Sequence, residues 1–162
     1  MDHIDKIVAQ WHKERDDLNV APMALIGRVK RLSLHLTREM EKTWADYGLN
    51  AASFDVLATL RRSGPPFSLS PGDLIASTMV TSGTMTNRID QLAKAGHVER
   101  VQNPKDGRGF LVALTDEGYR VIDEAVTAHV TTQEKLVSGM SKSEKAQLET
   151  LLRTFQNGLE EP

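Results

Sequence analysis

The sequence contains no cysteine, which excludes a disulfide-bonded scaffold, a thiolate nucleophile, a thiol redox sensor and a zinc site with sulfur ligands. It also lacks long apolar runs, since no stretch approaches the roughly 20 apolar residues that a membrane-spanning helix needs. The opening residues, MDHIDKIVAQW, have early acids and no apolar segment of the kind found in signal peptides. We therefore expect a soluble, cytoplasmic protein that has no membrane partner.

Recognisable catalytic motifs are missing as well. The sequence has no HExxH motif, no GxSxG motif, no glycine loop that cradles phosphate and no histidine–carboxylate spacing suited to a metal. Its histidines lie in different segments, at positions His3, His12, His35, His97 and His129. We expect a protein that is not an enzyme and that uses no cofactor and no metal ion.

An excess of positive charge is also absent, because the net charge is −2. This balance argues against a surface that binds nucleic acid over its whole area. The charges are unevenly distributed, however, and the stretch from residue 88 to residue 108 has more bases than acids. Its bases are Arg88, Lys94, Arg100, Lys105 and Arg108, against Asp90, Glu99 and Asp106. This local basic strip is compatible with a polyanionic partner.

What the sequence does contain is a series of amphipathic segments with helix-start and helix-stop signals. Its 162 residues, 40% of them hydrophobic, suffice for one domain with a substantial core. The first two helices are predicted over about 4–15 and from Pro22, in a first turn, to Gly48. The next two are AASFDVLATLRRS, after the cap Asn50, and GDLIAS, after Ser70-Pro71. A fifth helix is predicted over 82–96. Two further helices are predicted, the first beginning at Thr115 and the second at the capping box SKSE, residues 141–144.

The periodicity changes between residues 97 and 114. HVERVQ and GFLVAL are β-prone runs, and NPKDGR between them has the proline and the Asp-Gly pair of a hairpin turn. A short helix, an amphipathic helix and a β-hairpin in this order form a winged helix-turn-helix, in which the second helix lies in the major groove. The predicted fold is therefore mainly α, with a small β-hairpin wing and long helices at both ends of the chain.

The segment SGTMTNRIDQLAKAG, residues 82–96, is the predicted recognition helix. Its apolar stripe includes Met85, Ile89 and Leu92, whereas the opposite side bears hydrogen-bonding side chains in place of the usual Glu/Lys mixture. Arg88 suits guanine, Asn87 or Gln91 suits adenine, and Thr84 suits a phosphate or a thymine methyl group. The bases of the hairpin tip suit a minor groove. The predicted DNA-binding residues are Ser82, Thr84, Thr86, Asn87, Arg88, Gln91, Lys105, Asp106 and Arg108. A plain solvated helix and turn is the alternative interpretation.

The stretch LIASTMVTSGTMTNRIDQLAKAGHVERVQNPKDGRGFLVALTDEG resembles the DNA-binding core of MarR-type transcription regulators. The marks of the resemblance are LAKAGHVER, the triplet Asp106-Gly107-Arg108 and LTDEG, and one departure is Gly109, where the family often has a second arginine. The resemblance implies an obligate homodimer that binds a palindromic operator, as a repressor, with Asp106 orienting Arg108. It also implies an extra N-terminal helix and loop over 1–20, dimerisation helices over 21–50 and 115–162, and a DNA-binding lobe over 51–114.

Asp55 and Arg62 are a second irregularity, because seven residues separate them on one side of a helix. The gap of about 10 Å along the axis leaves room for a small flat molecule, although two solvated charges are the plainer interpretation. The spacing resembles that of the urate-responsive branch of the MarR family, whose effector-binding residues match Trp11, Asp55, Arg62 and Arg88 here. The resemblance implies urate as the effector. Aconitate, citrate or a phenolic compound is the alternative, and a winged-helix module that binds protein is the alternative to a DNA-binding regulator.

Overall fold

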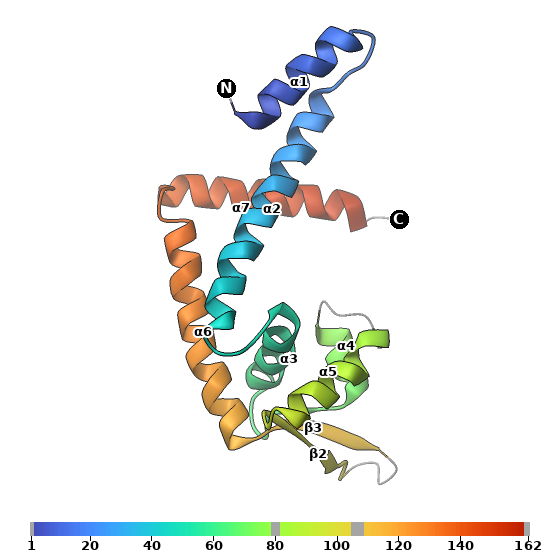
Figure 1. Cartoon of the computed structure of the whole chain (residues 1–162), viewed down its shortest axis with the longest axis vertical. Coiled ribbons are helices and arrows are strands. Elements are labelled where there is room, and N and C mark those ends of the chain that lie inside the picture. The colour runs from blue at the N-terminus through green and yellow to red at the C-terminus, as the bar shows by residue number, and fades with distance from the viewer. Residues whose placement is uncertain (1, 79–81, 105–108, 161–162) are drawn as a thin grey trace. The chain divides into compact units, whose positions relative to one another are not determined.

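The computed structural model describes residues 2–78, 82–104 and 109–160. The pattern of contacts divides the chain into two compact units, unit 1 at Met1–Glu41 and unit 2 at Lys42–Pro162. The helices are α1 (His3–Glu14), α2 (Ala21–Ala45), α3 (Ala51–Arg62), α4 (Pro71–Ser77), α5 (Ser82–Lys94), α6 (Asp116–Leu136) and α7 (Lys142–Glu160). The strands are β1 (Ser68–Leu69), β2 (Val98–Gln102) and β3 (Phe110–Leu114). The predicted mainly helical fold with a small sheet is confirmed (Figure 1).

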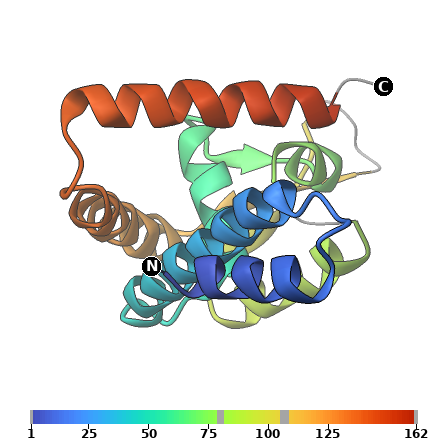
Figure 2. The same cartoon turned by 90° about the horizontal axis from the view of Figure 1, so that it is seen from above.

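In unit 1, α1 packs beside the first turns of α2 (Figure 1 and Figure 2). A capping box between Asp2 and Asp5 begins α1, and both carboxylates pair with Arg28 of α2. Ile4 is buried against Gly27, where a Cβ atom would lie 3.2 Å from the Ile4 Cδ1 atom. The absence of a side chain at Gly27 therefore provides the space that Ile4 occupies.

In unit 2, the end of α2 is fixed by aromatic packing. The ring of Trp44 stacks on the rings of Phe54 of α3 and His129 of α6, with distances between ring centroids of 5.0 Å and 5.6 Å. The turn after α2 ends with Gly48 at a φ of 68°, which glycine adopts without steric strain. Asn50 then caps α3 by accepting the backbone N–H groups of Ala52 and Ser53, as predicted.

The sheet has three antiparallel strands in the order β1-β3-β2. The predicted hairpin is present, with Val98 opposite Leu114 and Gln102 opposite Phe110. The short strand β1 was not predicted. Its two residues, Ser68 and Leu69, are too few to show a period, and they become a strand only because β3 offers its free edge.

The core of unit 2 lies where α3, α4, α5, α6 and the sheet meet. Apolar residues from each of these elements are almost fully buried, namely Val56, Leu57, Leu60, Leu74, Met85, Ile89, Val112 and Ile122. Arg61 joins α3 to α6 at the margin of this core, since its guanidinium pairs with Asp123 at 2.8 Å and lies over the ring of Tyr119 at 4.6 Å. The core thus holds α5 and the hairpin against the long helix α6.

After α6 the chain turns at residues 137–141 into α7, a continuous helix in Figure 2. The predicted capping box is confirmed: the Ser141 backbone N–H donates to the Glu144 carboxylate at 2.7 Å, and the Glu144 N–H donates to the Ser141 hydroxyl at 3.3 Å. No residue of α7 is buried. Among the described residues, no helix combines the length and apolar character needed to cross a membrane.

Candidate nucleic-acid interface

The two helices α4 and α5 form the helix-turn-helix pair. Ser70 caps α4 by accepting the Asp73 N–H at 3.1 Å, and Pro71 occupies the first turn, both as predicted. Leu74 is fully buried and anchors α4 to the core. The connection at residues 79–81 lies outside the described residues.

The two sides of α5 differ as the periodicity predicts. Met85, Ile89 and Leu92 are buried, with exposed fractions of 1%, 2% and 4%. The opposite side exposes four of the residues predicted to bind DNA, which are Thr84, Thr86, Asn87 and Gln91. The side chain of Ser82 lies outside the described residues. An α-helix about 10–12 Å in diameter fits the B-DNA major groove, about 12 Å wide. The exposed side chains are of the types that read base edges and bind phosphates.

Arg88 differs from its exposed neighbours on α5. It is half-buried, and its Nε atom is buried without a hydrogen-bond partner in the described part of the chain. It lines a cavity of about 140 Å³ between the start of α3 and α5, together with Asn50, Ser53, Gln91 and His97. The Nδ1 atom of His97 is likewise buried and unpartnered among the described residues. The side chain of Arg88 therefore lines this cavity in addition to contributing to the surface of α5.

The hairpin is tied to α5 at its base. The guanidinium of Arg100 on β2 forms an ion pair with Asp90 on α5 and lies over the ring of Phe110 on β3, 5.2 Å from its centroid. From the sequence, Arg100 counted only as part of the basic strip. The spacing of ten residues between Asp90 and Arg100 crosses a helix end and a turn, so no helical or strand period could reveal the pair.

The hairpin tip contains the other predicted DNA-binding residues. Lys105, Asp106 and Arg108 lie outside the described residues. Next to the tip, the Asn103 N–H donates to the Gly109 carbonyl at 3.2 Å, which closes the strand pair on the tip side. The predicted contacts of these three side chains with DNA stay predictions.

The predicted effector-binding residues lie on three helices. Trp11 lies on α1 and has an exposed fraction of 41%. On α3, Asp55 is half-buried and Arg62 is exposed. A guanidinium N–H of Arg62 donates to the carbonyl of Ser77 at 2.6 Å, at the last residue of α4. Arg62 thus already binds an oxygen acceptor, and that acceptor belongs to the helix-turn-helix.

Groups suited to metal binding were not expected from the sequence. Within the described ranges, no group of three or more His, Asp or Glu side chains is arranged to hold a metal ion.

Comparison with known proteins identifies the family. Residues 47–109, which contain α3, the helix-turn-helix and β2, match the model of the MarR family. The HTH-type transcriptional regulator PecS of Dickeya dadantii is 40% identical over 156 residues, which cover 96% of this chain and 94% of PecS. This chain belongs to the MarR family. It is a DNA-binding transcriptional regulator of the winged-helix type.

Other members of the MarR family are also similar. The multiple antibiotic resistance protein MarR of Escherichia coli is 32% identical over 106 residues, which cover 65% of this chain and 72% of that protein. The crystal structure of a cysteine-to-serine MarR variant with operator DNA has a TM-score of 0.72 and 27% identity, and covers 84% of this chain and 96% of that chain. A structure of BpsR from Bordetella bronchiseptica, whose DNA binding is regulated by 6-hydroxynicotinic acid, has a TM-score of 0.70 and 25% identity. The match covers 80% of this chain and 91% of the BpsR chain.

Proposed function

We propose that this MarR-family regulator binds a palindromic operator as a homodimer, represses transcription there, and leaves the DNA when a small anionic aromatic effector binds. The observation that carries the DNA part is the exposed polar side of α5, with Thr84, Thr86, Asn87 and Gln91 above a buried apolar stripe. In this proposal the bases and phosphates are contacted by Thr84, Asn87, Arg88 and Gln91, and the minor groove is contacted by Lys105 and Arg108.

The homodimer is supported by the apolar surface of α7. Leu151, Leu152 and Leu159 expose 66%, 44% and 72% of their surface in the single chain. A groove of about 470 Å³ runs along α7 and the turn before it. Its lining combines apolar with charged and polar residues, namely Val137, Met140, Leu148 and Leu152 with Lys145, Glu149, Arg153 and Gln156. Several large apolar side chains exposed on one helix are typical of an interface. We assign it to a second copy because a two-fold axis would place two copies of α5 one helical turn apart on the duplex.

Effector binding is proposed for Trp11, Asp55, Arg62 and Arg88. Arg62 supports a mechanism, because its guanidinium donates to the carbonyl of Ser77 at the end of α4. A carboxylate or another anion binds a guanidinium more strongly than a neutral carbonyl does. An anionic effector would therefore replace Ser77 at Arg62 and release the end of α4, the helix that precedes α5. Effector and operator would then oppose each other through one coupling free energy.

Urate is the effector that we propose, since Trp11 can cover a purine ring, Arg62 can bind its anionic edge and Asp55 can accept its ring N–H groups. The regulation of BpsR by 6-hydroxynicotinic acid supports a small heteroaromatic anion as the effector class. Aconitate, citrate and phenolic compounds are the competing effectors. These compounds should be compared with urate for their ability to release the protein from the operator.

The test of the operator is a gel-shift and footprint with duplexes from the intergenic region beside the gene. We expect a two-fold symmetric footprint and a complex that weakens with salt, with a log–log slope of about −0.9 per neutralised phosphate. No retardation at low salt would favour the protein-binding module instead.

The test of the effector adds millimolar urate, citrate or salicylate to that complex. We expect urate to release the wild-type protein and to fail with Asp55→Ala and Trp11→Phe, while Asp46→Ala, a change in an exposed acid of the turn after α2, responds normally. Wild-type binding that withstands urate but yields to citrate or salicylate replaces the effector. An unchanged response in both variants removes the proposed residues.

A further inference from the structure

The end of the recognition helix is joined to the beginning of α6 through the motif LTDEG, residues 114–118. The helix α5 ends in a Schellman arrangement, in which the His97 N–H donates to the Leu92 carbonyl at 2.9 Å and Gly96 has a φ of 79°. The next two carbonyls along the chain are those of Gly96 and His97. Both carbonyls accept hydrogen bonds from Thr115.

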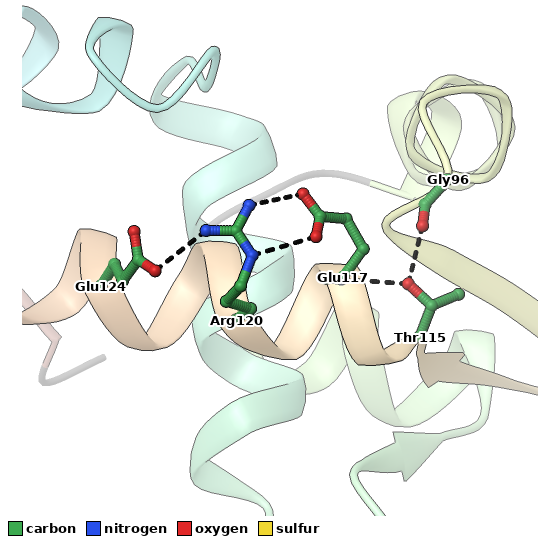
Figure 3. A network of polar contacts seen from close by, with 6 residues as sticks. Gly96, Thr115, Glu117, Arg120 and Glu124 are labelled. Carbon is green, nitrogen blue, oxygen red and sulfur yellow. Dashed lines mark hydrogen bonds and ion pairs between the residues drawn. The ribbon is translucent and has the colours of Figure 1, made fainter.

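Thr115 contacts the two carbonyls with two different donors. Its hydroxyl donates to the Gly96 carbonyl at 2.6 Å, and its backbone N–H donates to the His97 carbonyl at 3.1 Å. Figure 3 shows the contact between Thr115 and Gly96 beside the surface network of Arg120 with Glu117 and Glu124. The side chain of Thr115 thus ties the end of α5 to the first turn of α6.

The same hydroxyl also caps α6, because its oxygen accepts the Gly118 N–H at 3.0 Å. The hydroxyl proton therefore binds the end of α5, while an oxygen lone pair caps α6. Gly118 itself is fully enclosed there: a Cβ atom at this position would lie 1.8 Å from the His97 carbonyl oxygen. Only glycine permits the end of α5 to approach α6 this closely.

We infer that Thr115 is a positioning residue for DNA recognition, because its hydroxyl proton, together with its backbone N–H, holds the end of α5 on α6. This inference rests on the proposed homodimer, in which α6 and α7 connect each recognition helix to the two-fold axis. The distance between the two copies of α5 then depends on the joint at Thr115 and Gly118. Loss of the joint reduces the preference of the dimer for one spacing of half-sites.

The two tasks of the hydroxyl are separable by substitution. Thr115→Ser keeps both the donor and the acceptor. Thr115→Asp keeps the acceptor and caps a helix as well as serine does, but it has no proton to donate and directs a carboxylate at the Gly96 carbonyl. A residue that only caps α6 tolerates both changes, whereas a positioning residue tolerates only serine.

The experiment measures the affinity of each full-length variant for two duplexes of equal length, one with the native half-site spacing and one with a spacing changed by one base pair. Because both duplexes carry the same number of phosphates, the ratio of the two affinities is insensitive to the charge that aspartate adds. We expect Thr115→Ser to keep the wild-type ratio and Thr115→Asp to lower it about fivefold, the effect of losing one neutral hydrogen bond. Circular dichroism and sedimentation are expected to show a folded dimer in both variants.

A wild-type ratio in Thr115→Asp would overturn the inference, whatever the outcome for the operator itself. Failure of the wild-type protein to bind any palindromic duplex, or to dimerise, would instead count against the proposed function. Gly118→Ala gives a second reading of the joint and is expected to lower the ratio further, since its Cβ atom must push the His97 carbonyl away. If Gly118→Ala does not fold, the two Thr115 variants still decide the question.

Discussion

Arg100 and Asp90 join the wing to the recognition helix, because the guanidinium of Arg100 on β2 forms an ion pair with the Asp90 carboxylate on α5. The ring of Phe110 on β3 covers the guanidinium from the other strand of the hairpin. Three elements of the DNA-binding lobe therefore meet at one exposed arginine. An exposed ion pair contributes little to the free energy of unfolding, so we expect this pair to affect the orientation of the wing more than the stability of the fold.

Arg100→Ala is expected to weaken operator binding about tenfold with a change in the free energy of unfolding of less than about 1 kcal/mol. The reason is that the wing loses its tie to α5 while the core is unchanged. Anisotropy titrations and urea unfolding check the two quantities. Glu99→Ala is the matched control on the same strand, with an exposed side chain, and an equal loss of affinity in both variants would contradict the assignment.

Asn87→Ala tests base reading by the exposed side of α5. If Asn87 contacts adenine with both ends of its amide, the variant loses about 1–3 kcal/mol of discrimination between operator and random duplex. Its affinity for random duplex should remain unchanged, because non-specific binding comes from phosphate contacts. Asn157→Ala removes an exposed amide from α7 and serves as the control. An equal loss for operator and random duplex would show that Asn87 contacts phosphate only.

Leu151→Asp tests the dimer. The side chain exposes 66% of its surface in the single chain, so a charge there costs little in a monomer and much in a buried apolar interface. We expect sedimentation to show a monomer at micromolar concentration and gel-shift to show the loss of the two-half-site complex. Asn157→Asp adds a similar charge to the opposite side of α7. A Leu151→Asp protein that sediments as a wild-type dimer would place the interface elsewhere.

His129 predicts how the stability depends on pH. Burial lowers the pKa of its imidazole below the ordinary 6.5, so the folded chain binds a proton less readily than the unfolded chain. Stability is therefore full above the ordinary pKa and declines as the pH falls through it toward the lowered value. The carboxylate of Glu117, whose pKa is lowered by its hydrogen bond with Arg120, loses its contribution only below its ordinary 4.5.

The corresponding measurement is the Tm of wild type and His129→Phe at about pH 7.5 and about pH 5.5, a pair of values on either side of the imidazole transition. Phenylalanine keeps a ring against both Trp44 and Phe54 without the titrating group. We expect the Tm of the wild type to fall further between the two pH values than the Tm of the variant does. Equal shifts in both proteins would assign the pH dependence to other groups.

Much of the fold follows from local chemistry, which the sequence displays. The caps at Asn50, Ser70 and Ser141 and the buried stripe on α5 depend on residues within one or two helical turns, so the pattern alone predicts them. The sequence pattern does not predict β1, because this strand exists only through pairing with β3, where Ser68 lies opposite Ala113.

The candidate site shows the same division. The exposed positions of Thr84 and Asn87 follow from helical periodicity. The pairing of Arg100 with Asp90, the hydrogen bond of Arg62 to Ser77 and the burial of the Arg88 Nε atom depend on how separate elements pack. No spacing rule along one element encodes such contacts, since the partners come from different helices and strands.

Gly27 and Ile4 have a consequence for the aromatic residue of α1. Trp11 lies seven residues after Ile4, two turns along the same helix, and the docking of that helix depends on a space the size of one methyl group. A side chain at position 27 would press on Ile4 and require a shift at the contact between α1 and α2. If Trp11 covers the effector as proposed, the residue at position 27 would affect effector sensitivity without contacting either DNA or effector.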